Sequence, residues 1–214
     1  MNGNEKYIDR KNALRYMGCR DGAPQELLPL IDECESELCR EITPRFVYTV
    51  KNIDEIGFLL TGEDVKKHLE NCDKAVVLAA TLGVAVDALI RKYQSYDVTR
   101  ALIADAEASA AVEKLCDFAE AKIHESISGY FTWRYSPGYG DFPLEEQTEL
   151  LSIVDAGRKI GLFAGESYML TPAKSVTAVI GISKDIIAKE LSSCVTCTMS
   201  ESCSFRKEGF RCGF

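Results

Sequence analysis

The chain has 214 residues, 46% of them hydrophobic, which is enough to bury the core of one sizeable domain. Its formal net charge is −8 and its pI is about 5.0, and no run of Lys and Arg marks a basic face, so composition argues against a nucleic-acid partner. The first residues lack the apolar core of a signal peptide, and no apolar run approaches the roughly 18 residues that span a bilayer, so we expect a cytoplasmic protein without a membrane partner.

The nine cysteines are unevenly distributed along the chain. Five are scattered through apolar segments, whereas the other four crowd the last twenty or so residues. A disulfide framework is typical of small secreted domains, and this chain shows no secretory leader. We therefore expect the cysteines to remain thiols or to bind metal.

Two helices are predicted at the N-terminus. Asp9 to Tyr16 is followed by Gly18, which ends the first helix. Pro24 occupies a first-turn position of a longer helix that reaches about Arg40 with apolar residues at helical spacing. We interpret the pair as an N-terminal helical arm.

A hairpin and a capped helix are predicted next. Arg45–Val50 and Glu55–Leu60 are β-rich runs separated by four residues, a spacing that suits a hairpin. Thr61–Asp64 has the composition of a helix start, with acidic residues at the positive end of the helix, which would end near Cys72.

The centre of the sequence predicts a buried strand and two helices. Ala75–Gly83 is a continuous apolar run closed by glycine, and it leads into a helix over Val86–Tyr93. Asp97 is the expected N-cap of the longest helix, Val98 to about Ser126, whose alanine-rich face allows another element to approach closely.

The C-terminal half predicts strands on either side of a helix. Tyr130–Tyr135 is aromatic-rich and strand-like, and Pro143 begins a helix that runs to about Val154. Ser167–Leu170 and Ser175–Ile182 are predicted to pair with each other around the turn between them.

The fold class is therefore expected to be α+β. A mainly antiparallel twisted sheet would carry packed helices, with the N-terminal helical arm and a Cys-rich C-terminal tail as appendages. We expect the division to be residues 1–72 for the N-terminal helices and hairpin, 73–190 for the core, and 191–214 for the Cys-rich tail.

The segment from Arg134 to Pro143 gives the most specific indication of function in the sequence. Ser136-Pro137-Gly138-Tyr139 fits a type II turn, because proline fixes the first central φ and glycine tolerates the positive φ at the second. Arg134 ends the preceding strand, and its fixed fork of donors can bind a carboxylate, while Tyr139 can cover an apolar or purine face. From the residues alone, a surface turn with an exposed arginine is the simpler interpretation, since Pro-Gly turns are common.

A family resemblance adds to this interpretation. Arg-x-x-Pro-Gly-Tyr, followed by proline and an acidic helix start, resembles the adenosylmethionine-binding motif of the activation (reactivation) domain of cobalamin-dependent methionine synthase. The resemblance covers roughly residues 75–185, upstream through the helix that contains Glu113 and downstream through Gly161-Leu162 and Glu166–Val176.

The resemblance implies an adenosylmethionine site. Arg134 would bind the carboxylate of the methionine moiety, and the cofactor pocket would be lined by Tyr135, Ser136, Pro137, Gly138 and Tyr139. Glu113 would face the ammonium or sulfonium charge; the alternative is a solvated helix glutamate. The chain departs from the family after Ser175, where it lacks the long tip and tandem tyrosines that close the pocket in the full-length enzymes.

No substrate-binding barrel or cobalamin module precedes this segment, so the resemblance implies a stand-alone reactivation protein. It would support reductive methylation of cob(II)alamin in methionine synthase, and thus methionine biosynthesis, as a component of this methyltransferase without a catalytic base of its own. Cobalamin would be carried by the partner, either the cobalamin-binding module of methionine synthase or another corrinoid protein, with a flavodoxin or ferredoxin as candidate reductant. The alternative is a metal or iron–sulfur electron-relay module for another corrinoid methyltransferase.

The C-terminal cysteines form a candidate metal site. The pattern C-x2-C-x5-C-x8-C supplies four thiolates, enough for tetrahedral zinc or an iron–sulfur cluster, from Cys194, Cys197, Cys203 and Cys212. The first pair is the specific part, because the later spacings match no zinc ribbon closely. Redox-active thiols and a tail of inert cysteines stay as alternatives. A role in reactivation favours iron–sulfur, since reactivation needs an electron.

The remaining candidates are weaker. His68 and His124 lie on separate predicted helices without paired ligand spacing, and we interpret both as structural. Trp133 is expected in the core, with stacking on a corrin or adenine as the alternative. The sequence has no Gly-rich phosphate loop, no G-x-S-x-G and no H-E-x-x-H, which argues against hydrolase functions.

Overall fold

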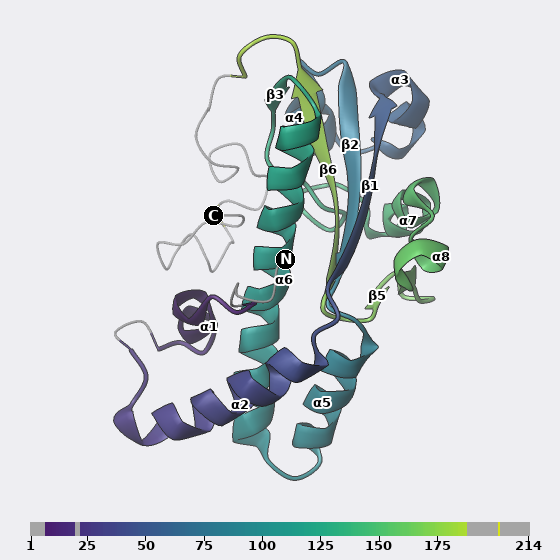
Figure 1. Ribbon diagram of the computed structural model, residues 1–214. Helices are drawn as coiled ribbons and strands as arrows, with labels where there is room; N and C mark the ends of the chain where they lie inside the picture. Colours follow the sequence, from purple (N-terminus) through teal and green to yellow (C-terminus); the bar gives the residue numbers. More distant parts are fainter. Residues whose placement is uncertain (1–6, 20–21, 188–200, 202–214) are drawn as a thin grey trace. The chain divides into compact units, whose positions relative to one another are not determined.

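The structure, a computed structural model, describes residues 7–19, 22–187 and 201 (Figure 1). Its main sheet is four-stranded and antiparallel, in the order β1-β2-β6-β3, and a second sheet consists of β4 and β5. Helices pack with these sheets, which confirms the predicted α+β class.

The chain divides into two compact units. Unit 1 consists of Met1–Val47, Ala79–Ile127 and Ala156–Val176, and unit 2 consists of Tyr48–Leu78, Ser128–Asp155 and Thr177–Phe214. Three strands contribute residues to both units: β1 (Arg45–Asn52), β2 (Lys74–Thr81) and β6 (Ser175–Ser183). The division predicted at residues 72 and 190 stays a prediction.

Unit 1 contains the four helices that the sequence predicts for it. They are α1 (Arg10–Tyr16), α2 (Leu28–Glu41, preceded by the 3-10 turn Gln25–Leu27), α5 (Val84–Gln94) and α6 (Val98–Ser126). The predicted N-cap is present, because Asp97 accepts a hydrogen bond from the Arg100 N–H. Asp9 also caps α1, accepting hydrogen bonds from the N–H groups of Lys11 and Asn12.

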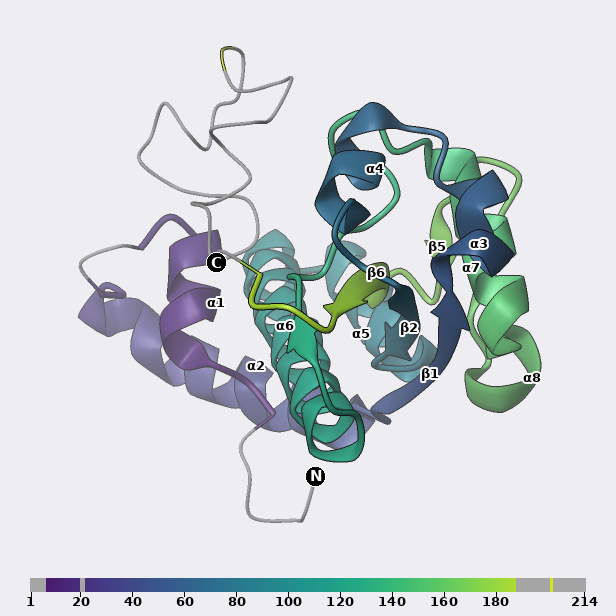
Figure 2. The same ribbon diagram turned by 90° about the horizontal axis from the view of Figure 1, so that it is seen from above.

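The core of unit 1 forms around α6. Figure 2 shows α1 and α2 beside this helix, and α5 also packs against it. The close packing follows from the small side chains that α6 buries, among them Ala101, Ala104, Ala108 and Ala111. The alanine-rich face that the sequence indicates is therefore the packing face of the helix.

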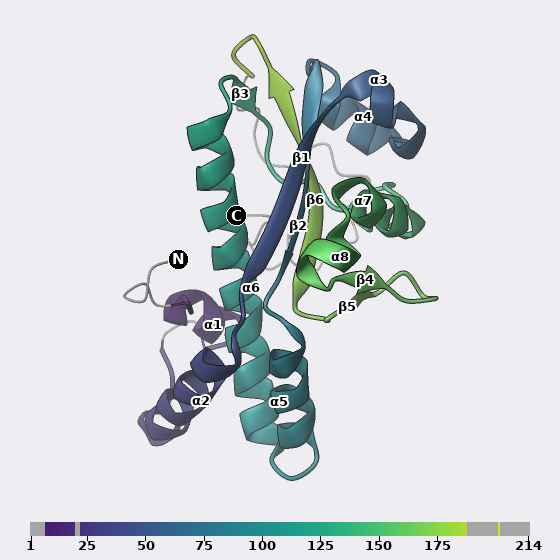
Figure 3. The ribbon, with the colours of Figure 1, turned by 45° about the vertical axis from the view of Figure 1, so that its right-hand side comes forward.

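The last part of unit 1 differs from the prediction. The segment Ser167–Leu170 does not pair with the strand that follows it; β5 (Leu170–Thr171) pairs with β4 (Phe163–Ala164), as Figure 3 shows. A tight turn causes this reversal, since Gly165 and Tyr168 hydrogen-bond across it and Tyr168 has a φ of 61°. The helix α8 (Ala156–Ile160) and the strand β4 were not predicted.

The predicted hairpin in unit 2 is wrong. Strand β1 is present, but the second β-rich run forms α3 (Ile53–Ile56) and a 3-10 turn (Gly57–Leu59). The cause is a capping box in which the Glu55 carboxylate accepts a hydrogen bond from the Asn52 N–H, 2.9 Å away. The cap starts a helix where apolar alternation alone favours a strand.

The other elements of unit 2 bring the Arg134 segment against the sheet. They are α4 (Glu63–Leu69), β3 (Tyr130–Phe131), a 3-10 turn (Leu144–Glu146) and α7 (Gln147–Val154). Strand β3 pairs with β6 in the register Tyr130↔Ser183 and Phe131↔Ile182. It is shorter than the predicted strand, and pairing resumes only at Tyr135, which bridges to Val179.

Candidate ligand-binding site

The predicted turn after Arg134 is confirmed. Tyr135 and Val179 exchange backbone hydrogen bonds of 2.9 and 2.8 Å, which attach the start of the turn to β6. The Tyr139 N–H then donates to the Ser136 carbonyl over 3.1 Å, and Gly138 has a φ of 89°. A hydrogen bond across four residues with positive φ at the third is the geometry expected of Pro-Gly in a type II turn.

The backbone amides of the turn bond within the loop itself. The Gly138 N–H donates to the Phe142 carbonyl over 2.8 Å, and the Phe142 N–H donates to the Tyr139 carbonyl over 2.9 Å. With the Tyr139 amide also engaged, contacts from this loop to a ligand fall mainly to side chains. The backbone of the loop thus satisfies its own hydrogen-bonding groups.

Tyr135 is the packed centre of the segment. Its ring is 7% exposed and stacks on His68, with 4.9 Å between ring centroids, and on Phe142, with 6.2 Å. Tyr139 meets the same ring edge-on and is 45% exposed. Of the two tyrosines in the motif, Tyr139 therefore presents the accessible ring.

Arg134 is half-buried and lies between an exposed and a buried residue. Trp133, on one side, is 40% exposed and packs edge-on against His68, with 4.5 Å between ring centroids. The expectation of a core tryptophan is therefore wrong, because the indole lies at the surface of unit 2. Arg134 thus shares a short stretch of backbone with two aromatic side chains.

His68 holds the backbone just before Arg134. Its Nε2 donates to the Trp133 carbonyl oxygen, 2.9 Å away, and the Thr132 hydroxyl lies 2.8 Å from the same nitrogen. Burial lowers the pKa of His68 to about 4, so the ring is neutral at neutral pH. The structural role of His68 is therefore to hold the backbone before Arg134, and the residues around His68 in the sequence give no sign of this contact.

Asp141 caps a helix that is distant in sequence. The N-cap of α4 is Gly62, which has no side chain, and the Asp141 carboxylate accepts hydrogen bonds from the N–H groups of Glu63, at 2.7 Å, and Asp64, at 3.0 Å. A Cβ on Gly62 would lie 2.7 Å from the Asp141 carbonyl oxygen, so only glycine fits there. The sequence predicted the start of this helix but not the residue that caps it.

Glu113 belongs to a pocket of unit 1. The pocket has a volume of about 450 Å³, and its walls come from α1, α6 and the start of β6. Lys174 is its cation; Nζ lies 2.8 Å from Asp105 Oδ1 and 2.9 Å from Ser109 Oγ. Glu113 therefore lies in unit 1, whereas Arg134–Tyr139 belong to unit 2.

The predicted metal ligands Cys194, Cys197, Cys203 and Cys212 lie outside the described residues. The structure gives the other five cysteines as thiols. Within residues 7–19, 22–187 and 201, no three His, Cys, Asp or Glu side chains gather as a metal site requires. No helix in that part of the chain has the length and apolar character needed to cross a membrane.

A scan of the sequence against protein-family models finds no match, and a search of curated proteins finds none either. The fold, in contrast, is similar to a solved one. The crystal structure of the MetH reactivation domain bound to AdoHcy superposes with a TM-score of 0.60 and 15% sequence identity, over 96% of this chain and 82% of that chain. The chain therefore has a reactivation-domain-like fold.

Proposed function

We propose that the chain is an S-adenosylmethionine-binding reactivation protein that supports the reductive methylation of cob(II)alamin in methionine synthase. The observation that carries the proposal is a coincidence of fold and motif. The chain has a fold similar to that of the MetH reactivation domain over 96% of its length, and it carries Arg-x-x-Pro-Gly-Tyr on a hydrogen-bonded turn of unit 2. The solved neighbour was crystallised with AdoHcy, which supports a related ligand here.

The residues of the turn fit a zwitterionic amino-acid ligand with an aromatic base. Arg134 offers a planar fork for the carboxylate, and Tyr139 offers an exposed ring for stacking. Ser136 adds a half-buried hydroxyl between them, while Pro137 and Gly138 shape the turn. When bound, adenosylmethionine supplies an activated methyl group on sulfur; the share of this chain is to bind and orient it.

Glu113 has a separate part in the proposal. Its carboxylate lines a pocket whose cation, Lys174, is paired with Asp105. From the family resemblance, we propose that Glu113 faces the ammonium or sulfonium group of the ligand, where a carboxylate favours the positive charge. We propose no proton transfer for Glu113 or for any other residue.

The partner in this proposal is a corrinoid protein. Cobalamin would be held by the cobalamin-binding module of methionine synthase or by another corrinoid protein, with a flavodoxin or ferredoxin as electron donor. The four C-terminal cysteines are proposed to hold zinc or an iron–sulfur cluster, and an iron–sulfur cluster would make the chain part of the electron path. Iron, sulfide and zinc analysis after anaerobic purification tests this part independently of ligand binding.

The first test of the function is a calorimetric titration of the full chain with adenosylmethionine. Arg134→Ala is expected to weaken binding at least about tenfold, because it removes the charged partner of the carboxylate. Arg134→Lys should fall between the two, since lysine keeps the charge and loses the fork. Arg91→Ala, an exposed arginine on α5, is the matched control and should bind as the parent does.

Absence of adenosylmethionine binding by the parent chain would overturn the proposal. A positive titration leads to the second assay, in which cob(II)alamin, a partner synthase, adenosylmethionine and a reductant are followed by absorbance. Conversion to the methylated form that depends on the chain supports reactivation. Binding without conversion, with every corrinoid partner tried, would favour the alternative of an electron-relay module.

A further inference from the structure

We propose that α4 is a clamp which holds the segment Thr132–Phe142 at both of its ends, and that His68 and Asp141 are positioning residues which fix the direction of Arg134. The clamp lies entirely within unit 2. Its consequence for ligand affinity rests on the proposed function, whereas the clamp itself can be tested on the free protein.

The first contact of the clamp is made by His68, in the last turn of α4. Its Nε2 hydrogen-bonds the Trp133 carbonyl oxygen at 2.9 Å, and the Thr132 hydroxyl lies 2.8 Å from that nitrogen. The Thr132 hydroxyl also accepts the Gly181 N–H of β6 over 2.7 Å. One imidazole thus joins the helix, the sheet and the peptide group that immediately precedes Arg134.

The second contact of the clamp is made by the N-terminus of α4. Asp141 accepts hydrogen bonds from the first two amides of the helix, where the helix dipole also favours its negative charge. Gly140 lies so close to α4 that an added Cβ would meet the Asp64 carboxylate and would be 2.6 Å from the Tyr135 hydroxyl oxygen. Close contact at this end therefore depends on both an acidic cap and a glycine.

Between these two contacts, the ring of His68 stacks on Tyr135 with an interplanar angle of 27°. The residue after Arg134 is thus fixed by stacking, and the residue before it is fixed through its carbonyl. A side chain between two fixed neighbours loses less freedom when it binds a ligand, which raises affinity without any new contact. His68 and Asp141 would act on the ligand through Arg134 only.

The first experiment needs no ligand. Trp133 is the only tryptophan of the chain, so tryptophan fluorescence, excited selectively over that of the tyrosines, reports on the contact that His68 makes. We expect His68→Leu to increase acrylamide quenching of Trp133 and to speed amide exchange of Trp133–Tyr135. His68→Gln keeps an N–H donor and should restore much of the parent behaviour. His124→Leu changes the only other histidine, on α6, and serves as the control.

The second experiment measures adenosylmethionine affinity by titration of the full chain. His68→Leu and Asp141→Ala should each weaken binding about fivefold, and His68→Gln should recover most of the loss. In the Arg134→Ala background, the same two changes should have no further effect, because their influence passes through the arginine. Additive losses in that double-mutant cycle would contradict the positioning role.

The two proposals fail in distinguishable ways. If the parent chain does not bind adenosylmethionine, the proposed function is wrong, and the clamp is then decided by the quenching and exchange measurements. Unchanged Trp133 quenching and exchange in folded His68→Leu would overturn the clamp, whatever the ligand result. If His68→Leu does not fold, Asp141→Ala provides the same comparison through exchange of Tyr139–Phe142 and of the first turn of α4.

Discussion

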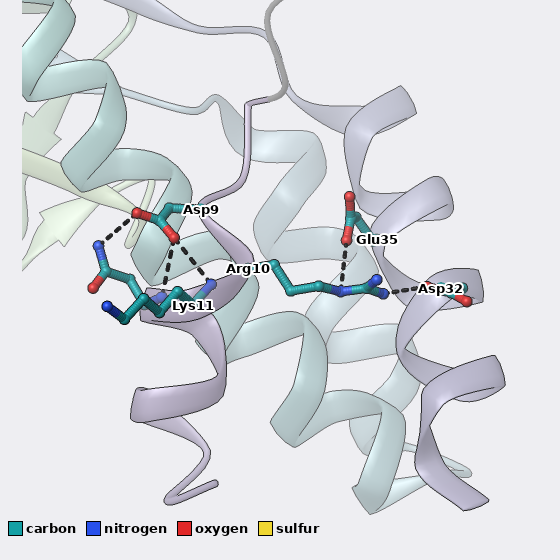
Figure 4. Close-up of polar contacts among 6 residues, drawn as sticks. Asp9, Arg10, Lys11, Asp32 and Glu35 are labelled. Atoms are coloured by element: carbon teal, nitrogen blue, oxygen red, sulfur yellow. Dashed lines mark hydrogen bonds and ion pairs between the residues drawn. The ribbon is translucent and has the colours of Figure 1, made fainter. Parts of the chain in front are cut away.

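Glu107 is a buried carboxyl group of unit 1. Its side chain is 1% exposed on α6, and neither carboxylate oxygen has a hydrogen-bond partner among the described residues. Burial raises the pKa of Glu107 to about 8, and Glu35 adds to the effect. Arg10 opposes the rise in pKa, and its guanidinium is directed at Asp32 and Glu35, as Figure 4 shows. Glu107 is thus largely protonated at neutral pH.

Glu107→Gln should therefore change how stability depends on pH. The unfolded chain loses this proton near pH 4.5, but the folded chain keeps it to about pH 8, so the free energy of unfolding of the parent falls as pH rises between these values. Glutamine has no such proton. The variant should match the parent near pH 4.5 and exceed it by on the order of 5 kcal/mol at pH 9, measured by urea unfolding.

The exposed carboxyl of Glu26 gives the control for this measurement. Glu26→Gln should run parallel to the parent at every pH, because removal of an exposed charge leaves the burial of Glu107 unchanged. An unfolding free energy of Glu107→Gln that follows the parent from pH 5 to pH 9 would contradict the assignment of the buried proton.

Residues differ in how far their role could be predicted from the sequence. Pro137 and Gly138 predicted their turn correctly, because the φ restrictions of the two residues are local. His68 and Asp141 could not be assigned, since their partners lie 65 to 78 positions away along the chain. A histidine without ligand spacing and an aspartate in a turn carry no local sign of such contacts.

Helix α3 shows how a local polar signal can override hydrophobic alternation. The run after β1 has β-branched and aromatic residues, and on this basis it was predicted as a strand. The Asn52–Glu55 capping box instead starts a helix of four residues, and Lys51 adds an ion pair to Glu55 at 3.3 Å. Asn and Glu three positions apart are the local sign of this helix start.

Asn52→Ala should destabilise the chain by about 1 kcal/mol, because the first amides of α3 lose their cap. Amide exchange of Ile53–Ile56 should accelerate while the exchange of β1 stays unchanged. Glu55→Gln keeps an acceptor for the Asn52 N–H and should have the smaller effect. Equal exchange rates in Asn52→Ala and the parent would show that tertiary packing alone holds this helix.

For the chain as a whole, the order of helices and strands was largely predicted, whereas strand pairing was not. Helix α6 was predicted at its observed bounds because its cap and its alanine-rich face are local features of one continuous segment. The pairing of β5 with β4 depends on the turn at Gly165 and Tyr168, where a non-glycine residue takes positive φ against its usual preference. The fold is similar to that of the MetH reactivation domain at only 15% sequence identity. Such a similarity is expected, because a fold tolerates many substitutions as long as the pattern of packed apolar residues is kept.

The stabilisation of the folded chain by a bound ligand provides a test of the role proposed for Glu113. A ligand that binds only the folded chain raises the free energy of unfolding by about 2.7 kcal/mol at one hundred times its Kd. Adenosylmethionine and S-adenosylhomocysteine differ at sulfur by a methyl group and a positive charge. If Glu113 faces that charge, Glu113→Gln should reduce the melting-temperature shift given by adenosylmethionine and leave the shift given by S-adenosylhomocysteine nearly unchanged. An equal reduction for both ligands would place Glu113 at the ammonium group, which the two share, and no reduction for either would make it a solvated helix glutamate.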